Sequence, residues 1–227
     1  MESLIAGVEQ GSPVEVTVFR LTVSTVLAVV TGLLAQVTFR LGPVPYTMQN
    51  AGVVLSGLLL PPRWALLSQL LYLALIATGL PLAAGLRGGV GILLGPTGGY
   101  LAAFPLAALL TAVLRELYER GCGRTLREAG RRDLVVLWLL SCAAAVPIYL
   151  LGYLVFARWV SADPRLAAWA MGSSRLFGVR DAALAIPLVS VLIFIPQDFA
   201  MDHALAVLVA WRVARSLSRE YSLLTRG

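Results

Sequence analysis

Residues 134–157 read LVVLWLLSCAAAVPIYLLGYLVFA, a run with no Asp, Glu, Lys, Arg or His. A helix needs about 20 apolar residues to cross roughly 30 Å of hydrocarbon, and this run meets that requirement. Three more runs without an ionised side chain cover residues 21–39, 64–86 and 88–114. Repeated segments of membrane length therefore decide the fold, and lipid is the solvent that they require.

The overall composition excludes an ordinary soluble globule. Hydrophobic residues make up 59% of the 227 positions and charged residues only 13%, which leaves too little polar surface to face water. The 18 basic residues are all Arg, and the net charge is +6. Because the arginines gather at the ends of the apolar runs, we assign them to membrane topology, and we expect no nucleic-acid partner.

We predict an all-α integral membrane protein, with residues 1–227 forming one bundle of about six transmembrane helices and outward-facing Gly/Pro-rich binding loops. The last apolar region contains Pro196 and three ionisable residues that follow it. It forms either one long helix kinked near Pro196 or an interfacial segment followed by a final helix, and we prefer the second interpretation. The predicted spans are residues 17–39, 51–62, 64–80, 90–114, 134–158 and 182–211.

The distribution of arginine predicts the orientation in the cytoplasmic membrane. Six spans place both termini on one side of the bilayer. Eleven arginines fall on that side, six of them in the 115–132 loop, and six fall on the other. Because cytoplasmic loops carry the excess of basic residues, we expect both termini to be cytoplasmic. Segments 42–50 and 79–99 then face outward.

These two outward segments contain too many helix breakers for ordinary spans, and non-helical backbone at membrane depth is tolerated only inside protein or beside a cavity. Their polar side chains offer paired hydrogen-bond donors and acceptors, and Arg87 is a permanent cation. This inventory suits a small neutral heterocycle that bears a carboxylate. Close helix packing is the alternative explanation for the glycines. The polar candidates are Thr47, Gln49, Asn50, Thr97 and Tyr100.

Three motifs occur in a fixed order along this region. Pro-Val-Pro-Tyr-Thr-Met-Gln covers 43–49, Gln-Leu-Leu-Tyr-Leu at 69–73 is followed by Gly-Leu-Pro at 79–81, and Gly-Pro-Thr-Gly-Gly-Tyr covers 95–100. Their combination closely resembles the BioY family, densely from about residue 42 to 110. The resemblance implies a six-helix substrate-binding component of an energy-coupling-factor (ECF) transporter. Such a component takes up biotin and has no enzymatic activity or cofactor.

The resemblance also implies substrate-binding positions. Asp198 follows from the Ile-Pro-Gln-Asp sequence at 195–198, although helix capping would also explain it. Many relatives carry Lys three residues later, where this chain has Met201. Arg87 therefore becomes the leading partner for the substrate carboxylate. The remaining implied contacts are Thr47, Gln49, Gly88, Gly89, Thr97, Gly98, Gly99 and Tyr100, with Asp202 and His203 as further polar candidates.

His203 is the only histidine, so it forms no metal cluster by itself, and a packed, hydrogen-bonded role is its alternative. A phosphate-binding loop of the Walker type requires Lys, which this chain lacks. ATP-driven transport would need a transmembrane coupling protein and two ATPase subunits as partners. Ser24, Ala28 and Gly32 recur every four residues and are predicted to dock the coupling protein, unless they pack against the chain's own helices.

Two other functions stay open at this point. A component for another vitamin, such as thiamin or riboflavin, would keep the architecture and change the loops. A proton-coupled secondary carrier would use Asp198, Asp202 and His203 as a relay within the membrane. A membrane enzyme is disfavoured because the residues assemble no nucleophile, base and orienting group.

Overall fold

The computed structural model describes residues 12–40 and 45–225, and this part of the chain is almost entirely helical. The helices are α2 (Pro13–Leu34), α3 (Gln49–Leu59), α4 (Pro62–Ala77), α5 (Val90–Leu93), α6 (Gly98–Cys122), α7 (Arg131–Ala144), α8 (Val146–Ala162), α9 (Pro164–Arg175), α10 (Ala182–Pro187), α11 (Ile195–Gln197), α12 (Ala204–Ser216) and α13 (Ser218–Thr225). Short elements between them are the strands β1 (Thr38–Arg40) and β2 (Pro45–Thr47), the 3₁₀ turn η1 (Leu126–Glu128) and the π-helical turns η2 (Leu188–Leu192) and η3 (Asp198–His203).

Four helical stretches are long and apolar enough to cross a membrane, namely Pro13–Leu34, Gly98–Cys122, Arg131–Ala162 and Ala183–Ser216. α4 is a shorter apolar helix. The chain is a multi-pass membrane protein built from helices, as the apolar runs predict. The number of crossings and their limits remain predictions.

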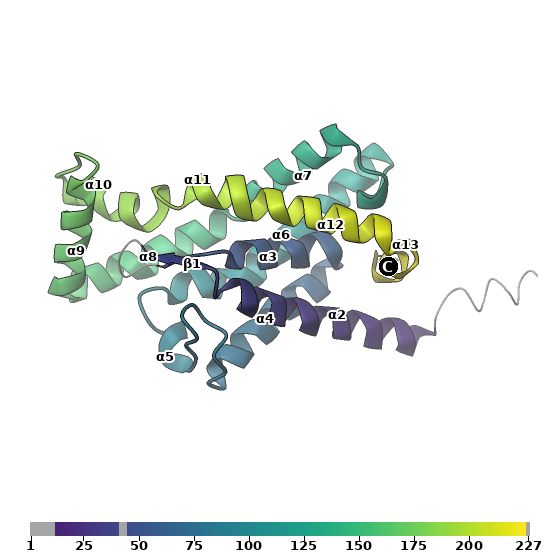
Figure 1. The fold of residues 1–227 in the computed structure, drawn as a ribbon, viewed down its shortest axis with the longest axis horizontal. Coiled ribbons are helices and arrows are strands. Elements are labelled where there is room, and N and C mark those ends of the chain that lie inside the picture. Colours follow the sequence, from purple (N-terminus) through teal and green to yellow (C-terminus); the bar gives the residue numbers. More distant parts are fainter. Residues whose placement is uncertain (1–11, 41–44, 226–227) are drawn as a thin grey trace, which may run out of the picture.

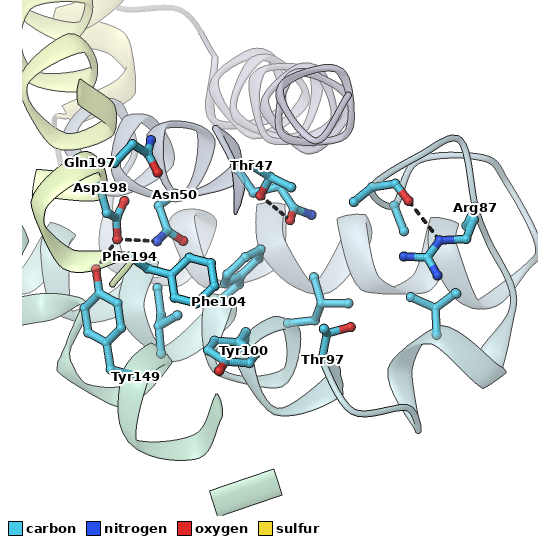
Figure 2. A pocket seen from close by; sticks show the side chains of 16 residues that line it. Thr47, Asn50, Arg87, Thr97, Tyr100, Phe104, Tyr149, Phe194, Gln197 and Asp198 are labelled. Carbon is cyan, nitrogen blue, oxygen red and sulfur yellow. Dashed lines mark hydrogen bonds between the residues drawn. The ribbon is translucent and has the colours of Figure 1, made fainter. Parts of the chain in front are cut away.

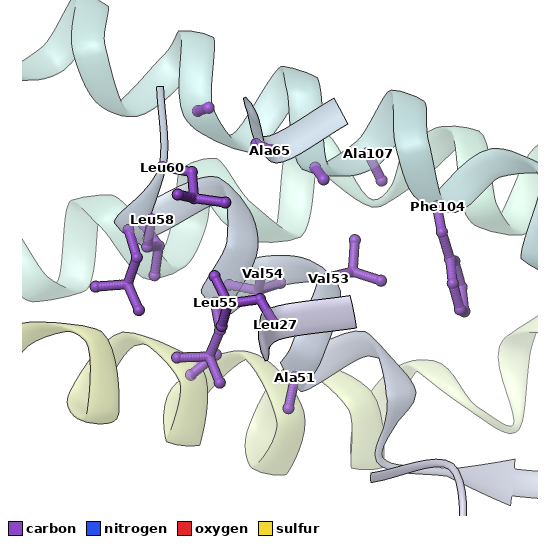
Figure 3. Close-up of a cluster of buried hydrophobic side chains, with 14 of the residues drawn as sticks. Leu27, Ala51, Val53, Val54, Leu55, Leu58, Leu60, Ala65, Phe104 and Ala107 are labelled. Carbon is purple, nitrogen blue, oxygen red and sulfur yellow. The ribbon is translucent and has the colours of Figure 1, made fainter. Parts of the chain in front are cut away.

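α3 forms the centre of the bundle. Every residue from 51 to 60 is buried, and α2, α4, α6 and α12 pack around the helix. Figure 3 shows this cluster, in which valine and leucine side chains of α3 meet Leu27 of α2 and Phe104 of α6. Glycines bring the helices close together, because a Cβ at Gly52 would lie 2.5 Å from Thr31 Oγ1 and one at Gly57 would lie 2.4 Å from Thr111 Cβ.

The small-residue stripe of α2 faces into this core. Ser24 and Ala28 are 0% exposed, and the Ser24 hydroxyl lies 3.3 Å from the carbonyl oxygen of Trp64 in α4. A Cβ at Gly32 would lie 2.8 Å from Leu82. Docking of a coupling protein at Ser24, Ala28 and Gly32 stays a prediction that this burial does not support. The stripe lets the chain's own helices approach closely, which was the alternative explanation.

α3 has 11 residues, about 17 Å of helix at 1.5 Å per residue, too short to cross a bilayer. An antiparallel hairpin precedes it, with Thr38 paired to Thr47 and Arg40 to Pro45. Tyr46 of this hairpin is buried, so the protein shields this part of the extended backbone. Residues 41–44, which include Pro43 and Val44 of the first motif, lie outside the described residues.

The helix limits differ most from the predicted spans at the end of α2 and at both ends of α6. α2 ends at Leu34, where the prediction continued to residue 39, because the hairpin begins at Thr38. α6 begins at Gly98, eight residues after the predicted start at 90, and ends at Cys122, eight residues after the predicted end at 114. Pro96 explains the later start: it restricts the preceding residue and has no N–H, so residues 90–93 form the separate turn α5.

The last apolar region is helical from Ala182 to Ser216, with the two π-helical turns η2 and η3 around a bend at α11. Pro196 lies in the first turn of α11, which explains why the backbone is irregular at this point. Figure 1 shows β1, α5, α9 and α10 at one end of the molecule and α13 with the C-terminus at the other.

Candidate functional site

A cavity opens at the end of the bundle that carries β1 and α5. It contains about 730 Å³ of empty space, a figure that includes the open mouth. Figure 2 shows the lining side chains, which come from segments far apart in the sequence. They are Thr47, Gln49, Asn50, Ala83, Ala84, Arg87, Ile92, Thr97, Tyr100, Leu101, Phe104, Ile148, Tyr149, Phe194, Gln197 and Asp198.

Asp198 provides the acidic end of the cavity. Its side chain is almost completely buried, and its Oδ2 accepts hydrogen bonds from Asn50 Nδ2 at 2.6 Å and from the Tyr149 hydroxyl. It makes no side-chain capping hydrogen bond, so capping is not the role that the structure shows. Two donors from α3 and α8 hold the carboxylate of the π-helical turn η3, and π-turns of this kind often mark functional sites.

His203 lies behind Asp198, and both groups are buried. His203 Nε2 is 3.8 Å from Asp198 Oδ1, and neither atom has a hydrogen-bond partner among the described residues. His203 Nδ1 is 2.8 Å from the Ser141 hydroxyl, which itself donates to the carbonyl oxygen of Trp138 at 2.7 Å. Because that hydroxyl has one proton, the Nδ1–H donates to Ser141, and a neutral ring then presents its lone pair toward Asp198.

Asp202 and His203 do not line the cavity. Asp202 is fully buried, and its Oδ1 accepts from Gln197 Nε2 at 2.7 Å. Gln197 does line the cavity, so Asp202 influences the cavity only through the side-chain amide of Gln197. Direct contact of Asp202 and His203 with the substrate stays a prediction that the lining of the cavity does not support.

Arg87 provides the basic end of the cavity. Its exposed side chain donates from Nε to the carbonyl oxygen of Ala84 at 3.0 Å, and no carboxylate of the described residues pairs with it. The two terminal nitrogens of its guanidinium group remain available to an anion. Figure 2 shows Arg87 and Asp198 at opposite ends of the site, with Thr47, Phe104 and Tyr100 between them.

Aromatic rings line the middle of the cavity, and hydrogen bonds fix several of them. The Tyr100 hydroxyl donates to the carbonyl oxygen of Ser190 at 2.6 Å, while Phe194 packs on Tyr46 with ring centroids 4.2 Å apart. The Tyr46 hydroxyl in turn donates to the carbonyl oxygen of Ile193 at 2.7 Å. Because their positions are set before a ligand arrives, these rings lose little additional conformational entropy when a ligand binds.

Thr47 and Gln49 connect the hairpin to the loop over the cavity. The Thr47 hydroxyl donates to Gln49 Oε1 at 2.7 Å, and Gln49 Nε2 donates to the Tyr72 hydroxyl. The Tyr72 hydroxyl in turn donates to the carbonyl oxygen of Leu82 at 3.0 Å. Gln49 is largely occupied by these bonds, so it positions the wall, and Thr47 is the more accessible of the two.

The predicted glycines lie outside the lining. A Cβ at Gly98 would lie 1.9 Å from the carbonyl oxygen of Leu93, and one at Gly99 would lie 2.3 Å from that of Leu151. A Cβ at Gly88 would lie 2.3 Å from the carbonyl oxygen of Leu80, while Gly89 has a φ of +96°. Backbone packing and a left-handed turn account for Gly88, Gly89, Gly98 and Gly99, and their direct contact with the substrate stays a prediction.

Sequence reasoning missed Tyr149, Gln197 and the aromatic wall of Phe104 and Phe194. Tyr149 lies inside a charge-free apolar run, where nothing marks it as a partner of Asp198. A phenol in the interior of a predicted span was the available signal, since a buried hydroxyl normally has a partner.

The chain matches the model of the BioY family over residues 9–219. A probable biotin transporter BioY from Pyrococcus horikoshii is 40% identical over 126 residues, which cover 56% of this chain and 67% of that protein. A probable biotin transporter BioY from Bacillus subtilis is 41% identical over 98 residues, 43% of this chain and 53% of its own length. The match to these relatives thus spans about half to two thirds of their lengths.

Two further comparisons cover most of the chain. A biotin transporter BioY from Lactococcus lactis is 27% identical over 191 residues, 84% of this chain and 86% of that protein. The crystal structure of the S-component for biotin from an ECF-type ABC transporter aligns with a TM-score of 0.69 and 22% identity, over 90% of this chain and 95% of that one. This likeness establishes the fold. These named relatives are transporters and not enzymes, and the match over residues 9–219 places this chain in the BioY family.

Proposed function

We propose that this chain captures biotin in the cavity between Arg87 and Asp198 and serves as the substrate-binding component of an ECF transporter. One observation carries the proposal: a cavity with a free guanidinium group at one end, a buried carboxylate at the other and aromatic walls between them. Membership of the BioY family supports biotin as the ligand, and its named relatives are biotin transporters.

Biotin is complementary to this arrangement. Its ring system carries a ureido group with two N–H donors and one carbonyl, and a flexible chain ends in a carboxylate. The Asp198 carboxylate is suited to accept from the ureido N–H groups, and Arg87 to bind the chain's carboxylate. Tyr100, Phe104 and Phe194 would pack on the apolar ring and chain. The reverse orientation would place the ligand carboxylate beside Asp198, where like charges repel.

Thr97 and Thr47 line the cavity between its two ends, and we assign their hydroxyls to the polar edge of the ligand. Asn50 uses one amide hydrogen on Asp198, which leaves its carbonyl oxygen and second hydrogen for the ureido group. Gly88, Gly89, Gly98 and Gly99 shape the backbone around this site, Asp202 holds the Gln197 side chain, and His203 lies behind Asp198.

The orientation and partners are also part of the proposal. With both termini cytoplasmic, the cavity opens outward, because β1 and α5 lie at the end opposite α13 (Figure 1). The six crossings would be formed by α2, α3 with its hairpin, α4, α6, α7 with α8, and the region from α10 to α12. The absence of Lys excludes a Walker loop in this chain, so a coupling protein and two ATPases would supply the energy.

The test is equilibrium binding of labelled biotin to the purified chain, with thiamin and riboflavin as competitors. We expect saturable binding that unlabelled biotin displaces and the other two vitamins do not. Saturable binding of labelled thiamin or riboflavin, with no binding of labelled biotin, would assign the cavity to another vitamin.

A further inference from the structure

An open apolar groove lies between α7 and α12, away from the cavity. Its lining side chains are all apolar, and they are Leu134, Val135 and Trp138 of α7 with Ala204, Val207 and Leu208 of α12. Trp138 directs its indole N–H away to the carbonyl oxygen of Phe199, at 2.7 Å. Val135 is 56% exposed and Leu208 51%, so the described part of the chain leaves this groove uncovered.

Arginines lie at one end of the groove. α7 begins at Arg131 and reaches the groove one turn later, whereas α12 passes the groove and then reaches Arg212 and Arg215. The two helices are antiparallel here, because Trp211 contacts the carbonyl oxygen of Ala129 at 3.1 Å while Trp138 contacts Phe199. The charged ends of both helices therefore meet at the same end of the groove.

These cations have no acidic partner among the described residues. Arg212 and Arg215 lie over the Trp211 ring, 5.4 and 4.9 Å from its centroid, and both are exposed. Arg131 and Arg132 occupy the first turn of α7, where the helix dipole disfavours positive charge. The neighbouring Asp133 does not compensate them, since it is buried and bonded to other groups.

We propose that this surface binds one anionic phospholipid, with an acyl chain in the α7/α12 groove and the phosphate among Arg131, Arg132, Arg212 and Arg215. An apolar groove that ends in guanidinium groups without an acidic partner matches a long hydrocarbon chain that ends in a phosphate diester. Guanidinium groups bind phosphate oxygens through paired hydrogen bonds. Trp211 suits this place, because tryptophan is enriched where hydrocarbon meets the headgroups.

The test is native mass spectrometry of the full chain in mild detergent, with equal amounts of phosphatidylglycerol and phosphatidylcholine that carry the same acyl chains. We expect the unaltered chain to retain phosphatidylglycerol preferentially. In Arg212→Gln with Arg215→Gln, that preference should fall about thirtyfold, given the attraction of each basic residue to anionic lipid. Val135→Trp should reduce retention of both lipids by filling the groove.

Two controls separate a specific site from general positive charge. Arg120→Gln with Arg127→Gln removes two exposed charges from the neighbouring 115–132 region, outside the groove, and should leave the preference unchanged. Arg212→Lys with Arg215→Lys keeps the charges and should retain most of it. Equal retention of both lipids by the unaltered chain would overturn the proposal. An equal loss in the Arg120/Arg127 control, or an apolar groove occupied only by a partner protein, would also overturn it.

Discussion

Arg87 and Asp198 differ in how the protein holds them, and this difference bears on their roles. Asp198 is buried and receives two side-chain hydrogen bonds, so its position is fixed before a ligand arrives. Arg87 is exposed and is held only through Nε, so its terminal nitrogens can follow a flexible chain. We infer that the acidic end recognises the rigid ring system and the basic end secures the carboxylate.

Arg87→Ala should weaken biotin binding about tenfold. A hydrogen bond to a charged group contributes about 1.5–3 kcal/mol, and the exposure of Arg87 favours the lower end of that range. The measurement is equilibrium binding of biotin and of biotin amide, which lacks the charge. The amide should bind the unaltered protein and the variant equally well. Arg165→Ala, an exposed arginine outside the cavity, is the control; an equal loss there would contradict the assignment.

Asp198→Asn should reduce biotin affinity at least about tenfold with little change in thermal stability. The amide oxygen of Asn can still accept from Asn50 and Tyr149, but the negative charge that attracts ureido N–H groups is lost. Tyr149→Phe should weaken binding by a smaller factor, and Tyr153→Phe, one turn further along α8, is its control. Unchanged binding in Asp198→Asn would leave this carboxylate with a purely structural role.

Sequence patterns identified the polar residues of the cavity better than their functions. Thr47, Asn50 and Asp198 stand out in their segments, and all three line the cavity. Asp202 and His203 stand out equally in the sequence, yet they lie behind the cavity. They follow Asp198 by about one turn of helix, and this is enough to move their side chains out of the lining. Tyr149 could not be assigned, since its partner is 49 residues away in the sequence.

At the scale of elements, α6 and α8 form the wall beneath the cavity, and two glycines set their separation. A Cβ at Gly99 would lie 2.3 Å from the carbonyl oxygen of Leu151, and one at Gly152 would lie 2.2 Å from the Tyr100 ring. The Gly-Pro-Thr-Gly-Gly-Tyr motif therefore specifies a close helix contact that in turn places Tyr100. The glycines of the motif indicated that something approaches the backbone closely here, but not whether it is a ligand or a neighbouring helix.

Gly99→Val should lower both the melting temperature and biotin binding, because the branched side chain forces α8 away from α6. Gly91→Val is a matched control on the adjacent turn α5, where a new Cβ meets nothing within 4 Å. The measurements are thermal unfolding in detergent and equilibrium binding. A folded Gly99→Val protein with normal affinity would show that this contact does not position the site.

The connection between α6 and α7 has a pH-dependent contribution to stability. Asp133 accepts from the Tyr118 hydroxyl at 2.6 Å, from Gly130 N at 2.8 Å and from Arg124 Nη2 at 2.9 Å. The Tyr118 hydrogen bond first, and then that from Gly130, hold the pKa of Asp133 below the usual 3.8. A carboxyl with a lowered pKa stabilises the folded state above its unfolded pKa, and this stabilisation is lost as pH falls through the folded pKa.

Asp133→Asn should therefore lower the melting temperature at neutral pH, and the difference from the unaltered protein should shrink as the pH falls below about 4. Tyr118→Phe should reproduce part of this pattern, because it removes the largest cause of the lowered pKa. Thermal unfolding measured across this pH range provides the check. A difference that stays constant with pH would assign the effect to packing alone.

At the scale of the whole molecule, the cavity lies toward one end of the helical bundle and an arginine-rich region lies toward the other. The cavity lies near β1 and α5, while the arginine-rich 115–132 region and α13 lie toward the opposite end (Figure 1). Hydropathy predicted the long helices, because lipid requires the same length and apolar character of each of them. It did not place α3 at the centre, since a short apolar helix looks the same whether lipid or protein surrounds it.

Uptake by the complete system should depend on ATPase partners. In proteoliposomes that contain the chain, a coupling protein and two ATPases, ATP should drive biotin accumulation, and a proton ionophore should leave it unchanged. The chain alone should bind biotin without accumulating it. Uptake that continues without the ATPases and collapses with the ionophore would instead support a carrier that uses Asp198, Asp202 and His203.

A structure of the chain with bound biotin tests the central claim most directly. The account predicts one biotin molecule in the cavity, with its ureido group within hydrogen-bonding distance of Asp198 and Asn50 and its carboxylate at the guanidinium group of Arg87. Tyr100, Phe104 and Phe194 should contact the ring system and the chain between these ends. Biotin bound in the reverse orientation, or at another place on the molecule, would contradict it.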